Sequence, residues 1–168
     1  GALQVRHGDW RSEESLYLSG LDHGADNAIV QANAAKALYS LAQFHRAEDH
    51  ARRAVQLDEQ YPNAWATLGA ILDAVGKHPG AEAAFERQHA LEASARSALN
   101  LSSFQANRGR LAEGLETLRR QARAGPPDPA LLAAIARLEA ELTTSSRPPS
   151  SRGPQGPPER AAEPLQRQ

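Results

Sequence analysis

The sequence contains no cysteine and no methionine, and only 5% of its 168 residues are aromatic. The absence of cysteine excludes disulfide bonds and cysteine-ligated metals. Lysine and arginine number 19 against 20 aspartates and glutamates, so the formal net charge is -1. The basic surplus that tight phosphate binding requires is therefore missing, and we expect no nucleic-acid partner.

Long apolar runs are also missing. No run approaches the roughly 18 residues that a membrane-spanning helix needs, and no signal peptide is visible. The chain begins Gly-Ala-Leu without an initiator methionine, so we expect a processed form or an excerpt of a longer protein. Membrane attachment is expected only through a missing portion upstream of Gly1.

The six histidines show no catalytic or metal-binding pattern. His45 and His50 are five residues apart, so they do not share a helix face, and no H-E-x-x-H sequence occurs. Glu13 and Glu14 are adjacent and would point apart, unlike a paired acid and base. The sequence predicts no catalytic residue, no metal and no cofactor in this chain. It leaves open whether the parent protein is an enzyme.

What the sequence does contain is a repeat. Ala47 and Ala81 are 34 residues apart, and alignment on them makes two units begin at Ala28 and Pro62. A third unit begins near Ala95. The second unit matches the W-x₂-L-G-x₂-Y…A-x₃-F pattern, with Leu in the Tyr position. Its matching residues are Trp65, Leu68, Gly69, Leu72, Gly76, Ala81 and Phe85.

This pattern resembles that of the tetratricopeptide-repeat proteins, in which each unit is a pair of antiparallel helices. Small residues such as Gly69 and Ala81 would lie where helices touch, and large ones such as Trp65 and Phe85 would fill the gaps. One pair cannot bury its apolar face alone, so pairs stack. The resemblance implies an all-α, right-handed superhelix with three repeats. We expect repeats at 28–61, 62–94 and 95–127, with helices at 28–41, 45–58, 62–75, 79–92, 96–107 and 111–124.

The segments beyond the repeats differ from them. Asp128 and Pro129 form an N-cap signal for a capping helix over 128–142, whose apolar stripe would cover the third pair. That stripe is Leu131, Leu132, Ile135, Leu138 and Leu142. Residues 143–168 are rich in Ser, Arg and Pro and are predicted to be disordered. Residues 1–27 are predicted to be a truncated leading half-repeat, or a membrane-exit segment followed by a helix.

One stretch near the N-terminus is more specific than the repeats. It reads Asp9-Trp10-Arg11-Ser12-Glu13-Glu14-Ser15-Leu16-Tyr17-Leu18-Ser19-Gly20-Leu21. It resembles the segment that opens the repeat region of the transmembrane-and-tetratricopeptide O-mannosyltransferases of the endoplasmic reticulum. The resemblance implies a parent that takes mannose from dolichyl-phosphate-mannose, with these repeats in the lumen recognising acceptor glycoproteins such as cadherins. The alternative is a cytoplasmic scaffold or co-chaperone-like adaptor without transferase activity.

A binding surface is expected on the concave face that the first helices line. The resemblance places positions 2, 5, 6, 9, 12 and 13 of each unit on that face. Several are asparagines, which both donate and accept hydrogen bonds and can hold a peptide backbone whatever its sequence. Position 5 is Ala32, Ala66 or Leu99, so the first lysine of the chaperone-type carboxylate clamp is missing. The predicted groove residues are Asn33, Lys36, Tyr39, Asn63, Thr67, Asp73, Arg96, Asn100 and Asn107.

Asn100-Leu101-Ser102 also matches the N-glycosylation acceptor sequence. A lumenal protein could carry a glycan there. Three-residue matches arise by chance about once in a chain of this length, and this one falls in the middle of a predicted helix. The match therefore does not decide between the two locations.

Overall fold

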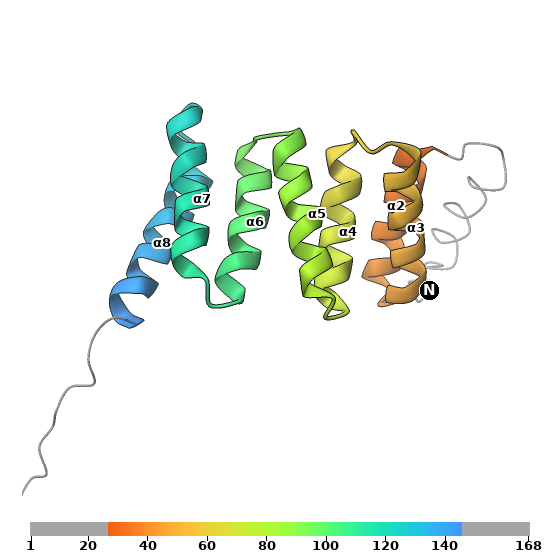
Figure 1. The fold of residues 1–168 in the computed structure, drawn as a ribbon, viewed down its shortest axis with the longest axis horizontal. Coiled ribbons are helices and arrows are strands. Elements are labelled where there is room, and N and C mark those ends of the chain that lie inside the picture. The colour runs from red at the N-terminus through yellow and green to blue at the C-terminus, as the bar shows by residue number, and fades with distance from the viewer. Residues whose placement is uncertain (1–26, 146–168) are drawn as a thin grey trace, which may run out of the picture.

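The computed structural model describes residues 27–145, and within that range it is built of helices with no strand. Consecutive helices pack as antiparallel pairs, α2 with α3, α4 with α5 and α6 with α7, and α8 packs on α7 (Figure 1). The all-α prediction is confirmed. The helices are α2 (Ala28–Ser40), α3 (Phe44–Leu57), α4 (Pro62–Ala74), α5 (His78–Leu91), α6 (Ala95–Asn107), α7 (Leu111–Ala124) and α8 (Pro129–Ser145).

Several helices begin at side chains that bind the free backbone N–H groups of the first turn. The side chain of Asn27 accepts a hydrogen bond from Val30 N at the start of α2. Ser94 and Ser97 form a reciprocal capping box at the start of α6. At the start of α8, Asp128 Oδ1 accepts hydrogen bonds from the backbone N–H groups of Ala130 and Leu131, as the predicted N-cap requires. Each of these contacts satisfies donors that a helix leaves unpaired.

The turns inside the second and third pairs depend on glycine. Gly76 and Gly109 have φ angles of 78° and 77°, in the left-handed region where a side chain is strained. Both residues directly follow the C-cap of a first helix. Glycine is the residue that helices most often use in this position, directly after their last turn.

Close packing inside the second pair involves a glycine and an aromatic ring. A Cβ atom placed on Gly69 of α4 would lie 2.9 Å from Cε1 of Phe85 in α5. Ala81 and Ala47 are fully buried, and Trp65 packs against the same core. Small residues therefore lie where helices touch, as the repeat pattern predicts.

One ion pair beside this core has a buried carboxylate. Glu48 of α3 is 3% exposed, and its Oε1 atom lies 2.6 Å from Lys77 Nζ in the turn before α5. Arg52, one turn further along α3, also contacts this carboxylate. Burial acts to raise the pKa of Glu48, but hydrogen bonds from Lys77 and Arg52 outweigh it and lower the pKa. The pair joins the first repeat to the second.

Helix α8 differs from its prediction in length and in one face. It extends to Ser145, so residues 143–145, which were expected to be disordered, are helical. Leu131 and Leu138 are buried, with Ile135 and Leu142 packed beside them, but Leu132 is 53% exposed. Leu132 follows Leu131 by about 100° around the helix, which turns it away from α7. The predictions for residues 1–26 and 146–168, including the Trp10 segment, lie outside the described residues.

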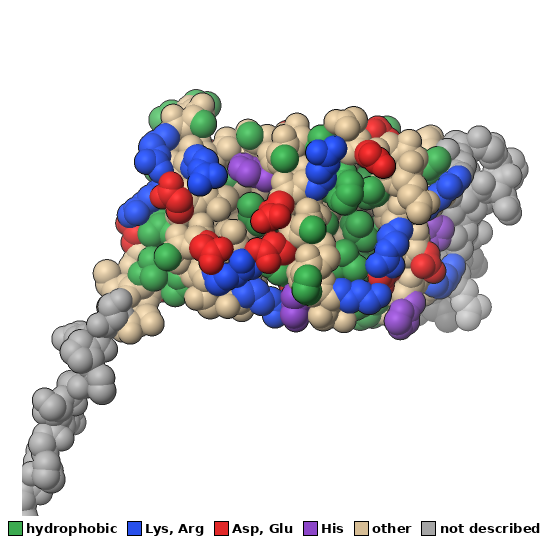
Figure 2. Space-filling model, in the orientation of Figure 1, with side chains coloured by type: hydrophobic (Ala, Val, Ile, Leu, Met, Phe, Trp, Pro, Cys, Tyr) green, Lys and Arg blue, Asp and Glu red, His purple; other side chains and the backbone are tan. Residues whose placement is uncertain are grey.

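Charged side chains of both signs lie close together on the face that Figure 2 shows. Ion pairs that join neighbouring elements include Arg110 with Glu82 and Arg119 with Glu139, both at 2.6 Å. None of the described helices combines the length and the apolar character needed to cross a membrane.

Candidate functional site

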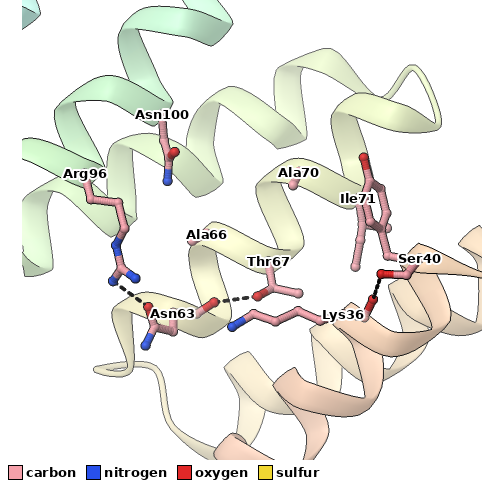
Figure 3. Close-up of a pocket in the computed structure, with 10 residues that line it drawn as sticks. Lys36, Ser40, Asn63, Ala66, Thr67, Ala70, Ile71, Arg96 and Asn100 are labelled. Carbon is pink, nitrogen blue, oxygen red and sulfur yellow. Dashed lines mark hydrogen bonds between the residues drawn. The ribbon is translucent and has the colours of Figure 1, made fainter. Parts of the chain in front are cut away.

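A hollow of about 320 Å³ lies across the first helices α2, α4 and α6. This volume lies at the lower end of the range for small-molecule pockets in proteins. All of its lining residues come from these three helices, and Figure 3 shows how Lys36, Asn63, Arg96 and Asn100 lie around it. They are Lys36, Tyr39, Ser40, Asn63, Ala66, Thr67, Ala70, Ile71, Arg96 and Asn100.

Helical spacing explains why these residues share one face. In α4 the lining follows Asn63, Thr67 and Ile71, at intervals of four residues. Lys36 and Ser40 repeat this interval in α2, and Arg96 and Asn100 repeat it in α6. Side chains three or four positions apart lie above one another on a helix. Stacking of the repeats then aligns the three rows into one groove.

Asn63 is the polar centre of the floor. Its Oδ1 atom accepts a hydrogen bond from Arg96 Nη2 at 2.7 Å, across the boundary between the second and third repeats. Its Nδ2 atom donates to the hydroxyl of Tyr61 at 3.3 Å. The Thr67 hydroxyl donates to the backbone oxygen of Asn63 at 2.7 Å, so it is already engaged. Asn63 thus holds the guanidinium of Arg96 over the groove.

Asn100 is held by a residue that the sequence did not single out. Its Nδ2 atom donates to Oε1 of Gln88, a fully buried side chain of α5, at 3.1 Å. Because this bond fixes the amide, the Asn100 carbonyl oxygen is left as an acceptor at the groove. The Gln88 Nε2 atom is buried with no hydrogen-bond partner in the described chain. A lone glutamine in a second helix carries no sequence signal for this role.

Of the nine predicted groove residues, six line the hollow together: Lys36, Tyr39, Asn63, Thr67, Arg96 and Asn100. Ala66, Ala70 and Ser40 occupy the inner-face positions 5, 9 and 13 and line it too, whereas Ile71, at position 10, was not expected.

The other three predicted residues lie outside this lining. Asn33 and Asn107 are exposed elsewhere on α2 and α6. Asp73 forms an ion pair with Arg108, and its Oδ1 atom lies 3.2 Å from Nδ1 of His78. Arg108 also stacks on the ring of Phe104, 5.5 Å from its centroid. The Asp73 carboxylate is therefore engaged in joining α4 to the end of α6.

Two histidines are packed into the repeats, away from the hollow. His50 Nδ1 lies 2.7 Å from Gln31 Oε1, and His89 Nδ1 lies 2.9 Å from Ser97 Oγ. Burial lowers the pKa of both, and neighbouring arginines lower it further. Residues 27–145 contain no group of three or more His, Asp or Glu side chains placed to hold a metal ion.

No protein-family model and no curated protein sequence matches the chain. Several solved structures are similar to it. MamA is 18% identical with a TM-score of 0.67, over 81% of this chain and 80% of MamA. YrrB, described as a TPR protein with an unusual peptide-binding site, is 17% identical with a TM-score of 0.62, over 78% of this chain and 68% of YrrB.

A third similar structure is the first TPR of Spaghetti (RPAP3), bound to the HSP90 peptide SRMEEVD. It is 14% identical with a TM-score of 0.60, over 69% of this chain and 93% of that one. At these identities the likeness concerns the fold. The stacked helix pairs, the glycine turns and these structural neighbours together show that the chain has the tetratricopeptide-repeat fold.

Proposed function

We propose that this chain is a protein-recognition module that binds an extended peptide segment in the groove across α2, α4 and α6. The observation that carries the proposal is the lining of the hollow, which comes entirely from the first helices of three successive repeats. The structural neighbours YrrB and RPAP3 are described with a peptide-binding site and a bound peptide, which supports the same use of the fold.

The chemistry of the lining suits a peptide. Asn100 offers an acceptor for a backbone N–H group, while Ala66 and Ala70 offer a narrow apolar strip. Tyr39 is 40% exposed at one side of the groove, where an aromatic ring can contact a ligand side chain. The hollow is open rather than enclosed, which suits a segment of chain better than a small metabolite.

A random peptide library displayed on phage tests this proposal. The immobilised 168-residue chain should enrich a peptide consensus, and synthetic copies should bind it in solution. Ala70→Gln puts a larger neutral side chain into the groove and should weaken binding at least tenfold. Ala83→Gln is the matched control, since Ala83 is exposed on α5 outside the hollow, and it should bind as the unmodified chain does. Equal loss in both variants, or no enrichment, would count against the groove.

We further propose that the parent protein is a dolichyl-phosphate-mannose protein O-mannosyltransferase in which this module recognises acceptor glycoproteins, such as cadherins, in the lumen of the endoplasmic reticulum. The support is the Asp9–Leu21 segment, whose likeness to that family is separate from the repeats. The catalytic portion would lie in the membrane-spanning part of the parent.

The coding sequence upstream of Gly1 tests this second proposal. Several apolar stretches of about 20 residues, ending just before Gly1, are expected. A further half-repeat with Trp and Leu in register would instead indicate a scaffold or co-chaperone-like adaptor without transferase activity. The peptide-binding proposal does not depend on this outcome.

A further inference from the structure

Two cationic side chains from different repeats converge on the floor of the groove. Figure 3 shows Lys36 extending from α2 and Arg96 extending from α6, both toward Asn63 at the start of α4. Arg96 is fixed there by its 2.7 Å hydrogen bond to Asn63. The two residues are 60 positions apart in sequence, so only the stacking of the repeats brings them to one site.

No acidic side chain among the groove's lining residues balances these two positive charges. None of its ten lining residues is an aspartate or a glutamate. Within residues 27–145, Lys36 has no carboxylate partner, and the carboxylate recorded near Arg96 is Glu92, 3.8 Å away and 46% exposed outside the lining. Elsewhere, cations of second helices form closer pairs, such as Arg119 with Glu139. The groove therefore has a local excess of positive charge on a chain that is formally slightly negative.

The remaining donors suit a carboxylate. A guanidinium has five N–H donors, and Asn63 occupies one of those of Arg96. The ammonium of Lys36 has three donors and is available from the opposite side. A carboxylate between them would accept charge-assisted hydrogen bonds from both, which are stronger than bonds between neutral groups.

We propose that this site binds the side-chain carboxylate of an aspartate or glutamate within the bound peptide, so that the groove selects acidic segments. The inference rests on the peptide-binding function proposed above. Lining residues continue one helical turn beyond each cation, with Asn100 on α6 and with Tyr39 and Ser40 on α2. A peptide therefore has contacts beyond the carboxylate, and an internal side chain is the occupant that we propose.

Two display libraries separate this inference from the proposed function. In one, random 12-residue peptides are fused at both ends; in the other, they end in a free carboxylate. Enrichment of Asp or Glu at one fixed position in the internal library is expected. Enrichment of peptides with no acidic preference would overturn the inference and leave the peptide-binding proposal standing. Enrichment only in the free-end library would overturn the choice of a side chain, and enrichment in neither would overturn the proposed function.

Synthetic peptides then test the two cations. For the consensus peptide, Lys36→Ala and Arg96→Ala should each weaken binding by about three- to tenfold. Arg120→Ala, which removes an exposed cation from α7 outside the hollow, should leave binding unchanged. Changing the acidic residue of the peptide to Gln should weaken binding to the unmodified chain but have little further effect on the Lys36→Ala, Arg96→Ala double variant. An undiminished effect of that Gln peptide on the double variant would show that the carboxylate binds elsewhere.

Discussion

Ala42 adopts the left-handed backbone conformation, with a φ angle of 56°, at the repeat position where Gly76 has a φ angle of 78°. The two residues are 34 positions apart, and each follows the C-cap of a first helix. The backbone N–H of the following residue bonds to the first helix in both turns, from Gln43 to Leu38 and from Lys77 to Leu72. The first repeat therefore makes the same turn as the second with a residue that is poorly suited to it.

We predict that Ala42→Gly stabilises the protein. A left-handed conformation costs a residue with a Cβ atom about 1–2 kcal/mol, part of which is offset because glycine gains freedom in the unfolded chain. The net gain should be about 0.5–1 kcal/mol. Urea unfolding followed by circular dichroism measures it. The reverse change, Gly76→Ala, should cost about 1 kcal/mol although no atom lies within 4 Å of the added Cβ. Stabilisation by Gly76→Ala would contradict this account.

Gly69→Ala is expected to destabilise the protein by about 1 kcal/mol despite the higher helix propensity of alanine. The added methyl group would meet three atoms of the Phe85 ring at 2.9–3.1 Å, and overpacking of this kind costs about 1–3 kcal/mol. The higher helix propensity of alanine offsets roughly 1 kcal/mol of this cost. Gly80→Ala is the control, because its Cβ meets only the flexible Leu72 Cδ1 atom, and it should be neutral or stabilising. If Phe85→Leu abolishes the difference between the two alanine variants, the clash is with the ring.

Most of the helical framework could be predicted because its signals are local. Glycine and alanine recur at a fixed period, and Asp128 lies directly before a first-turn proline. Where the prediction of α8 was wrong, the cause was a contact with another helix. Leu132 is as apolar as Leu131, and only the position of α7 decides which of them is buried.

The groove was predictable only in part because its composition depends on contacts between repeats. Repeat positions placed Lys36, Asn63 and Arg96 on one face, and the structure brings them together. The same positions also included Asp73, whose carboxylate pairs with Arg108, 35 residues away. No spacing rule within one repeat predicts that pair, nor the contact between Gln88 and Asn100.

Glu48 should make the protein sensitive to acid. Its pKa is lowered in the folded state, so its contribution to stability is present above the pKa of the unfolded chain, near 4.5, and is lost as the pH falls through the lower folded value. At pH 7, Glu48→Gln should cost about 1–2 kcal/mol, a modest figure because Lys77 and Arg52 are about half exposed.

The measurement is the free energy of unfolding in urea between pH 7 and pH 3, for both proteins. The difference between them should shrink as the pH falls, because protonated glutamate and glutamine are then alike in charge. A constant difference across this range would show that the carboxylate charge is not what stabilises the junction of the first two repeats.

Gln88 gives a prediction that links the core to the groove. Its buried Nε2 atom has no hydrogen-bond partner within residues 27–145, so Gln88→Leu should remove an unsatisfied donor and leave stability unchanged or raise it by about 1 kcal/mol. Gln88→Ala should instead cost about 2–3 kcal/mol, because it leaves a cavity in a fully buried position.

Both variants at Gln88 free Asn100 from the bond that orients its amide, so both should weaken binding of a groove-selected peptide, by about three- to tenfold. Thermal unfolding and fluorescence anisotropy measure the two effects separately. A Gln88→Leu variant that is stable and binds the peptide normally would show that Asn100 needs no orientation by Gln88.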